Sequence, residues 1–275
     1  NSNPHNYSGV LINSGSEDVN HDGLIIPAFT SIAPDGTVTD ISEALGYEVY
    51  VEASPLSDII YLTGGSESGV RWTAGDDYII GPEDGGWFYG SGYSNYNRNS
   101  NDLPETGLTF EFNDGVLTID SDYGLITAEN LNWVQGTPYD DVFIGDENYQ
   151  NFRGDGGLDT FTGGQGSDNF RLQARYNNDV LIESYAIITD FEEVDRIGFE
   201  DYGFSMDPDV VKDQFTVTQD LSNNKTYISI ETDIATVTNM FTLEGVFYLE
   251  RFNTEEYEQN LTLWFSEVES FNNLI

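Results

Sequence analysis

A nine-residue period between Gly136 and Arg171 constrains the fold of this chain more than any other feature. The stretch divides into the blocks GTPYDDVFI, GDENYQNFR, GDGGLDTFT and GGQGSDNFR. Every block begins with glycine and has phenylalanine at its eighth position, and the sixth position is aspartate in all but the second block, which has Gln150. Because three columns stay in phase over consecutive blocks, we interpret the period as a structural repeat rather than a glycine-rich loop region.

Each column of the repeat has a physical reason. Glycine allows positive φ, so the start of a block can turn tightly and present its backbone carbonyls. The aspartate adds a carboxylate, and carbonyl and carboxylate oxygens are the ligands that Ca²⁺ prefers. The last three residues are expected to form a short strand whose middle side chain points inward. Stacked blocks would then bury the four phenylalanines, Phe143, Phe152, Phe161 and Phe170.

These blocks resemble the calcium-binding nonapeptide repeat GGxGxDxUx of the RTX (repeats-in-toxin, hemolysin-type) family. The resemblance implies a parallel β-roll that holds Ca²⁺ between turns two repeats apart on the same edge. By position it pairs Asp141 with Asp159, and it pairs Asp168 with Gln150, which lacks the charge. The second site is therefore expected to be weaker or differently built. The implied metal ligands of the array are Asp141, Asp159 and Asp168, with the turn residues Gly136, Gly154, Gly156, Gly163 and Gly166.

The charge of the chain narrows the range of partners. Its 275 residues include 49 Asp and Glu against 9 Lys and Arg, which gives a formal net charge of −40. Such a charge repels nucleic acid and anionic membranes, and it opposes compaction unless cations neutralise part of it. Disorder requires low hydrophobicity, whereas 38% of the residues are hydrophobic and 14% are aromatic. The composition therefore favours a cation-loaded fold.

The sequence shows no disulfide, no membrane span and no signal peptide. The chain has no cysteine, so a metal is the obvious alternative to disulfides as the staple of an extracellular fold. No segment approaches the roughly 18 apolar residues of a membrane span. The opening NSNPHNYSG lacks the basic and apolar regions of a signal peptide, and no initiator Met precedes it. We expect the chain to be part of a longer protein.

Residues 1–56 are expected to form an N-terminal β cap with a candidate calcium loop. Asp18, Asn20 and Asp22, followed by glycine, match the opening of an EF-hand-type loop. Oxygens at alternate positions can converge on one ion. Phe29 stands where such a loop has its bidentate glutamate, so an ordinary Asp/Asn turn is the alternative.

Residues 57–172 are predicted to form the β-roll, with a non-repeat insertion near 91–135. A degraded repeat precedes the insertion, where Asp58 and Asp77 stand nineteen positions apart, or one nine plus one ten. Asp77 follows a glycine turn and is a further candidate ligand. Within the insertion, alternating apolar residues on both sides of 113–115 predict a strand, a turn and a strand.

The stretch 87–98 allows two interpretations. Its aromatic, serine, glycine, asparagine and arginine residues are typical of recognition loops, in which flat rings stack on sugars and polar groups bind hydroxyls. Alternatively, its aromatic residues belong to the core and the remainder is an insertion loop. Under the first interpretation, the chain binds an extracellular glycan through Trp87, Tyr89, Tyr93, Tyr96 and Arg98.

Residues 173–275 are predicted to form a C-terminal β cap. The segment 187–199 resembles the I-x-D-F-x-x-x-D-x-I segment that follows the last repeat in RTX modules. The resemblance implies that Asp190 and Asp195 close a final calcium site while apolar residues cover the open end of the roll; solvated turn acids are the alternative. Further strands are expected at 215–217, 227–230, 241–243 and 260–265.

No catalytic constellation is apparent in the sequence. The two histidines, His5 and His21, lie in the polar N-terminal region, and the chain has no HExxH, GxSxG or P-loop motif. We therefore predict a non-enzymatic, all-β module, a right-handed parallel β-roll (β-solenoid) with N-terminal and C-terminal β caps. The RTX resemblance implies Ca²⁺-driven folding, type I secretion to the medium or the bacterial surface, and a structural or adhesin-like role in a larger protein. A carbohydrate-active enzyme with an acidic groove is a further alternative.

Overall fold

The computed structural model describes residues 10–13, 23–25, 30–32, 38–40, 49–52, 58–62, 68–72, 74–90, 104–177, 180–182, 184–205, 207–255 and 260–267. The chain divides into two compact units. Unit 1 comprises Asn1–Glu105 and Phe110–Gln135, and unit 2 comprises Thr106–Thr109 and Gly136–Ile275. Nearly every element in the described part is a β-strand, so the prediction of an all-β fold is confirmed.

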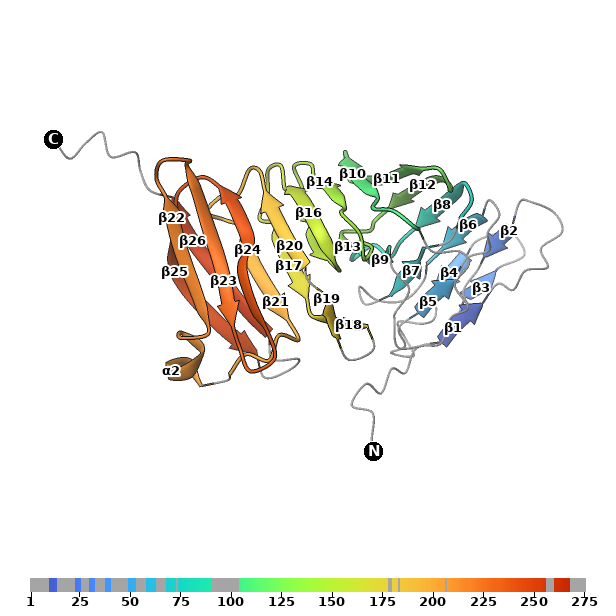
Figure 1. Ribbon diagram of the computed structural model, residues 1–275. Helices are drawn as coiled ribbons and strands as arrows, with labels where there is room; N and C mark the ends of the chain where they lie inside the picture. Colours follow the sequence, from blue (N-terminus) through green and yellow to red (C-terminus); the bar gives the residue numbers. More distant parts are fainter. Residues whose placement is uncertain are drawn as a thin grey trace, which may run out of the picture. The chain divides into compact units, whose positions relative to one another are not determined.

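Most of the described strands of unit 1 belong to two sheets, in which neighbouring strands are mostly parallel (Figure 1). In one sheet all neighbours are parallel, in the order β1 (Val10–Asn13), β5 (Val49–Glu52), β7 (Gly69–Arg71), β9 (Trp87–Tyr89) and β13 (Trp133–Gln135). The other sheet has the parallel strands β2 (Gly23–Ile25), β6 (Asp58–Tyr61), β8 (Asp77–Ile80) and β12 (Gly124–Glu129), then the antiparallel strands β11 (Val116–Ser121) and β10 (Thr109–Asn113). A separate antiparallel pair consists of β3 (Thr30–Ile32) and β4 (Val38–Asp40).

The antiparallel strands of unit 1 turn where the sequence predicts. Asn113 pairs with Val116, which leaves Asp114 and Gly115 as a two-residue turn. The two turn residues have φ of 51° and 78°. A tight hairpin of this kind requires positive φ at both central positions, which Asp and Gly tolerate. The predicted strand, turn and strand are therefore confirmed.

In unit 2, consecutive strands of the array alternate between two sheets, here called sheet A and sheet B (Figure 1). Sheet A has the parallel strands β15 (Asn151–Gly154), β17 (Asn169–Gln173) and β21 (Arg196–Glu200), then the antiparallel strands β26 (Asn260–Glu267) and β25 (Phe247–Glu255). Sheet B has the parallel strands β14 (Val142–Ile144), β16 (Gly157–Thr162), β20 (Ser184–Ile188) and β24 (Thr236–Glu244), then the antiparallel strands β23 (Lys225–Glu231) and β22 (Phe215–Asp220). A short hairpin, β18 (Arg175–Asn177) and β19 (Val180–Ile182), lies between β17 and β20 in the chain.

The register of unit 2 follows the nine-residue period. Val142 pairs with Thr160 in sheet B, and Asn151 pairs with Asn169 in sheet A. Each offset equals 18 residues, or two blocks. One block therefore supplies one strand to one sheet, and the next block supplies the following strand to the other sheet.

The phenylalanine column forms the core between the two sheets of unit 2. Its four members, Phe143, Phe152, Phe161 and Phe170, have no exposed surface. Ring centroids lie 4.7 Å apart between Phe143 and Phe161, and 5.6 Å apart between Phe161 and Phe170. The predicted inward stack of phenylalanines is confirmed.

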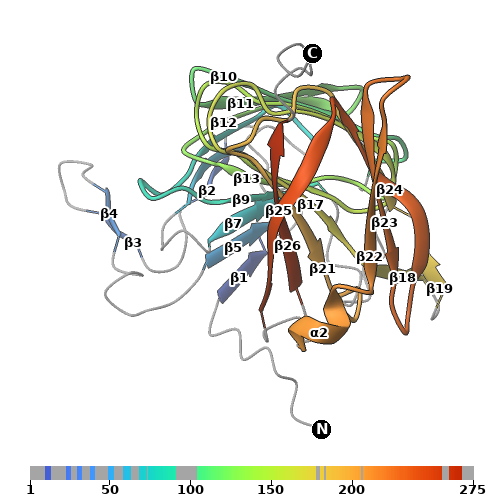
Figure 2. The ribbon, with the colours of Figure 1, turned by 90° about the vertical axis from the view of Figure 1, so that its left-hand side faces the viewer.

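The C-terminal end of unit 2 is closed by aromatic packing. Phe191 lies 6.2 Å from Phe170 and 5.8 Å from Phe265, measured between ring centroids, so it covers the end of the phenylalanine column. Phe215 of β22 and Phe252 of β25 lie 5.6 Å apart and join the last strands of the two sheets. Figure 2 views this end, with the helix α2 (Pro208–Val211) at one end of the strands. Among the described residues, no helix is long and apolar enough to cross a membrane.

The four strands expected after residue 200 are present, and the sequence interpretation missed β25. Its register shifts between Leu249 and Arg251, where Glu250 is inserted as a bulge. A bulge adds one residue to a strand and so breaks the alternation of apolar and polar residues on which the sequence interpretation depended.

Candidate metal site

The sixth position of each repeat block is buried where its strand begins. Asp141, Asp159 and Asp168 are each at most 1% exposed. The backbone N–H of Asp141 donates to Oδ1 of Asp159 at 3.0 Å, and that of Gln150 donates to Oδ1 of Asp168 at 2.8 Å. Each carboxylate therefore bonds to the backbone of the same position two blocks earlier, which brings together the pairs that the RTX resemblance implies.

Asp195 continues the column that contains Gln150 and Asp168. Its Oδ1 accepts from the backbone N–H of Asp168 at 2.9 Å, and its Oδ2 accepts from that of Glu192 at 2.7 Å. Asp195 is 3% exposed, so it is not a solvated turn acid. Asp190 accepts from the backbone N–H groups of Gly163 and Gly164, both at 2.8 Å. The two acids after the array thus contact its last turn.

The side chains at the sixth position differ between blocks in whether both of their polar atoms have hydrogen-bond partners. In Asp141 both oxygens have partners, because Oδ2 accepts from the backbone N–H of Thr137 at 2.6 Å and Oδ1 accepts from that of Leu108 at 2.7 Å. Oδ2 of Asp159, Oδ2 of Asp168 and Oε1 of Gln150 are buried and have no hydrogen-bond partner among the described residues. A buried oxygen without a donor is costly, so these three atoms mark positions where a cation would be favourable.

The first glycine of a block lies directly against the sixth side chain of the same block. A Cβ atom on Gly154 would lie 2.0 Å from Oδ2 of Asp159, and one on Gly163 would lie 2.6 Å from Oδ2 of Asp168. Gly136 has the same relation to Asp141, at 2.4 Å. No larger residue fits these positions without displacing the carboxylate. Of the other turn glycines, Gly156 is buried and Gly166 has a φ of 125°.

Burial raises the pKa of all four carboxyls in these columns. From an ordinary value of 3.8, the pKa rises to about 7 for Asp141 and Asp168, to about 9 for Asp159 and to about 6 for Asp195. Desolvation is the largest cause in each case, and the negative charge of Asp141 raises the pKa of Asp159 further. The backbone hydrogen bonds act in the opposite direction but do not offset burial. None of the four forms an ion pair with Lys or Arg among the described residues.

The donor set suits a hard cation such as Ca²⁺. A Cβ on Gly145 would lie 2.0 Å from the carbonyl oxygen of Gly163 and 2.7 Å from Oε1 of Gln150, so a turn carbonyl and a side-chain amide oxygen are close neighbours there. Ca²⁺ takes carbonyl, amide and carboxylate oxygens as ligands. In the part of the chain that the structure describes, no group of three or more His, Cys, Asp or Glu side chains is placed to hold a metal. A calcium ion here would therefore need backbone carbonyls from the turns in addition to Asp159 or Asp168.

The remaining predicted ligands fall into two groups. Asp77 begins β8, is 4% exposed, and pairs across the sheet with Ile126 of β12. On the β12 side, Asp77 therefore has no carboxylate beside it. On the β6 side, Ile59 pairs with Tyr78, and this register places Asp58 beside Asp77. The candidate ligands of the EF-hand-type loop, Asp18, Asn20 and Asp22, lie outside the described residues.

Trp87 and Tyr89 do not form an exposed platform for sugars. They are 7% and 6% exposed, and their rings stack at 5.5 Å. Trp87 also lies 4.2 Å from Trp133, measured between ring centroids. This part of the glycan-loop hypothesis is wrong, because rings packed on one another and buried cannot receive a ligand. Tyr93, Tyr96 and Arg98 lie outside the described residues.

The sequence interpretation missed a second set of acids that lie one position earlier. Oδ1 of Asp140 accepts from the backbone N–H of Leu158 at 2.7 Å, and in unit 1 Oδ1 of Asp76 accepts from that of Leu125 at 2.9 Å. Both acids belong to Asp–Asp doublets, and both donors are the leucine of a Gly–Leu step, which is a signal that the sequence contains. Buried Asp155, also missed, adds negative charge near Asp141 and Asp159.

Comparison with known proteins does not assign the chain to a family. No model of a known protein family matches the sequence, and a search of curated proteins finds no match. What the chain does must therefore be inferred from its repeat and from the geometry of the buried carboxylates.

Proposed function

We propose that this chain is a secreted calcium-binding module of the RTX type, a right-handed parallel β-roll whose folding is driven by extracellular Ca²⁺. The observation that carries the proposal is the column of buried carboxylates, with Asp159 and Asp168 each keeping one oxygen without a partner among the described residues. Buried charge of one sign is strongly unfavourable unless a counter-charge accompanies it.

Two processes can relieve this charge, namely protonation and cation binding. Protonation suffices only while the pH stays below the raised pKa values of these carboxyls. At a pH above these pKa values the carboxyls are ionised, and Ca²⁺ is the counter-charge that an extracellular medium supplies. Extracellular modules typically bind Ca²⁺ with a Kd of roughly 10⁻⁴ to 10⁻³ M. A ligand that binds only the folded chain adds about 2.7 kcal/mol per site at a hundredfold excess over Kd. A few sites therefore approach the roughly 5–15 kcal/mol of a whole domain.

The two columns are proposed to bind Ca²⁺ with different strength. The column of Asp141 and Asp159 offers two carboxylates, whereas the turn that contains Gln150 offers a neutral amide beside Asp168. Nε2 of Gln150 donates to Oδ1 of Asp146 at 2.6 Å, an orientation that leaves Oε1 available as a ligand. Fewer charged ligands mean weaker binding, so we expect the first column to fill at lower calcium.

The proposed biological role follows from this switch. In a calcium-poor cytosol, a net charge of −40 and the buried acids oppose folding, which suits export by type I secretion. Outside the cell, Ca²⁺ would complete the fold, and the folded module would serve as a structural or adhesive part of a larger bacterial surface or secreted protein. That the chain is not an enzyme stays a prediction.

A calcium titration followed by far-UV circular dichroism tests the proposal. Chelator-stripped protein should pass from coil to β-structure cooperatively as Ca²⁺ is added. Asp159→Ala should shift the midpoint to higher calcium by roughly tenfold, the effect of about 1.4 kcal/mol of lost binding energy. Glu147→Ala, which removes an exposed acid from the same array, should leave the midpoint unchanged. A β spectrum that does not depend on calcium would refute the proposed switch.

A further inference from the structure

The outer face of sheet A in unit 2 carries basic side chains that calcium binding does not use. This face consists of the side chains that point away from the phenylalanine core. In β17, Arg171 lies between Phe170 and Leu172, which are both fully buried, and so points outward. The whole chain has 9 Lys and Arg. Four of them are on this face and define what we call the arginine face: Arg153, Arg171, Arg196 and Arg251.

Two of these arginines flank one tryptophan in a row across three strands. Arg251 of β25 pairs with Trp264 of β26, and its guanidinium lies 4.5 Å from the centre of the indole ring. Ile197 pairs with Leu263, so Arg196 stands level with Trp264 on the other side. Arg196 and Arg251 are exposed, and neither forms an ion pair with any described residue. The row therefore presents two exposed cations, without an ion pair in the described part of the chain, on either side of an aromatic ring.

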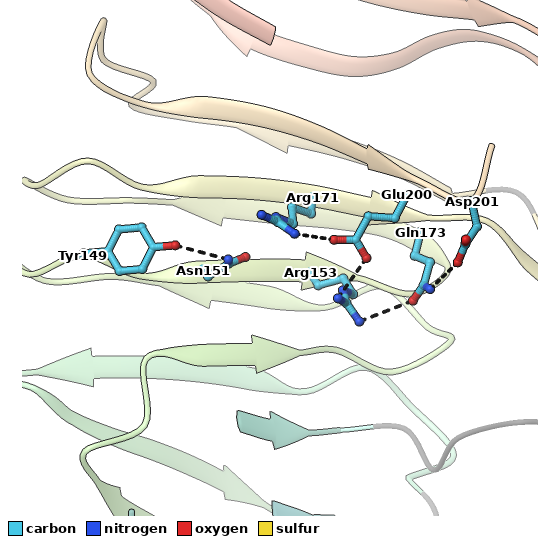
Figure 3. A network of polar contacts seen from close by, with 7 residues as sticks. All are labelled: Tyr149, Asn151, Arg153, Arg171, Gln173, Glu200 and Asp201. Carbon is cyan, nitrogen blue, oxygen red and sulfur yellow. Dashed lines mark hydrogen bonds and ion pairs between the residues drawn. The ribbon is translucent and has the colours of Figure 1, made fainter. Parts of the chain in front are cut away.

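The other two arginines are held in place by a buried acid, as Figure 3 shows. Glu200, 2% exposed, lies 2.6 Å from Nη1 of Arg171 and 2.8 Å from Nη2 of Arg153. Gln173 donates to Asp201 at 2.6 Å beside them. The Arg171 side chain lies flat over Gly198, where a Cβ would lie 3.0 Å from its Cγ. Two guanidinium groups and two carboxylates, Glu200 and Asp201, balance in this network, so the cations that this face offers to a ligand are Arg196 and Arg251.

We propose that the arginine face binds an anionic polysaccharide whose charge comes from sugar carboxylates. Guanidinium groups bind carboxylates with two parallel hydrogen bonds, and stacking on Trp264 restrains the Arg251 guanidinium before a ligand arrives. Successive strands of a sheet lie about 4.8 Å apart, so Arg196 and Arg251, on the two strands that flank β26, are separated by about two such spacings and suit an extended ligand with more than one carboxylate. Indole rings also pack against the apolar faces of sugar rings.

Charge complementarity favours this partner over other anions. Nucleic acid carries one charge per roughly 1.7 Å of helix, and it would meet strong repulsion from a chain of net charge −40. A second copy of the chain would bring another −40 and is disfavoured for the same reason. A carboxylated polysaccharide has a lower charge density and presents groups that match the guanidinium fork.

Titration with a short oligogalacturonate, followed by tryptophan fluorescence at saturating Ca²⁺, tests this proposal on the full chain. We expect saturable binding that weakens as salt is raised, and no response to a neutral maltooligosaccharide of the same length. The double variant Arg196→Gln/Arg251→Gln should bind at least roughly tenfold more weakly, since each lost pair is a charge-assisted hydrogen bond. Trp264→Phe should remove most of the fluorescence change.

The matched control is Lys212→Gln/Lys225→Gln, which removes two cations located on α2's C-terminal side and in sheet B. It should bind like the wild type, because the change in net charge is the same but the arginine face is intact. Equal weakening in both double variants would overturn the proposal in favour of general electrostatic attraction. Absence of binding, or equally tight binding of single-stranded DNA, would overturn it as well.

Discussion

Glycine at the first position of a block is a steric requirement of the buried acid at the sixth. Because the side-chain oxygen occupies the space that a Cβ would fill, the two columns of the repeat are coupled residue by residue. The coupling explains why glycine and the acid recur together, and it predicts a measurable interaction between particular pairs.

Gly154→Ala is expected to destabilise the protein by about 1–3 kcal/mol, because its methyl group would overlap Oδ2 of Asp159. In the Asp159→Ala background the obstacle is gone, so the same substitution should cost at least about 1 kcal/mol less. Urea denaturation at saturating Ca²⁺ measures both. Asp168→Ala is the control background, since its oxygen lies against Gly163. Additivity in both backgrounds would show that the predicted coupling does not exist.

At the scale of elements, the unit of construction is a pair of blocks. One block supplies a strand to sheet B and the next supplies a strand to sheet A, so the cap strands β20 and β21 join the correct sheets only after an even number of blocks. Apolar and polar residues alternate along these strands, which fixes the face that each strand turns to the core. A strand that moved to the other sheet would expose its apolar residues.

Deletion of residues 145–162, two blocks, should therefore leave a chain that still unfolds cooperatively, although at a lower temperature because two strands are lost. Deletion of residues 145–153, one block, removes less of the chain but should abolish cooperative unfolding. Thermal unfolding in Ca²⁺, followed by circular dichroism, compares the two. If the one-block deletion were the more stable of the pair, the alternation of blocks would not govern the fold.

The whole molecule is governed by excess negative charge, part of it buried. The four buried carboxyls have raised pKa values in the folded state, so between pH 3.8 and about 9 these four groups bind more protons in the folded chain than in the unfolded chain. The free energy of unfolding without metal must then fall as the pH rises through this range. Ca²⁺ reverses the situation, because it binds the ionised carboxylates.

Metal-free protein should accordingly melt at a higher temperature at about pH 5.5 than at about pH 8.5, and saturating Ca²⁺ should raise the melting temperature mainly at the higher pH. Asp159→Asn removes the group with the highest of these pKa values and should flatten the metal-free pH dependence. A metal-free protein that becomes more stable as the pH rises would contradict the burial of ionisable acids.

Much of this protein is determined by its sequence alone. The nine-residue period predicts the short strands of the array and the inward phenylalanines, since strand periodicity and glycine turns are local properties. The offset of two blocks and the pairing of Asp141 with Asp159 were expected only from the RTX resemblance. The sequence also contains the Asp–Asp doublets, but which backbone N–H group each first aspartate accepts from depends on the strand beside it.

Only the tertiary structure decided which polar groups lose water and which side chains share a face. Whether Trp87 is a ligand platform or packed against Trp133 depends on the neighbouring strand, which is distant in the sequence. Likewise, Arg196, Trp264 and Arg251 come from three strands, and no local pattern connects them. Burial and juxtaposition across a sheet are sums over non-local neighbours, and they exist only once the chain has folded.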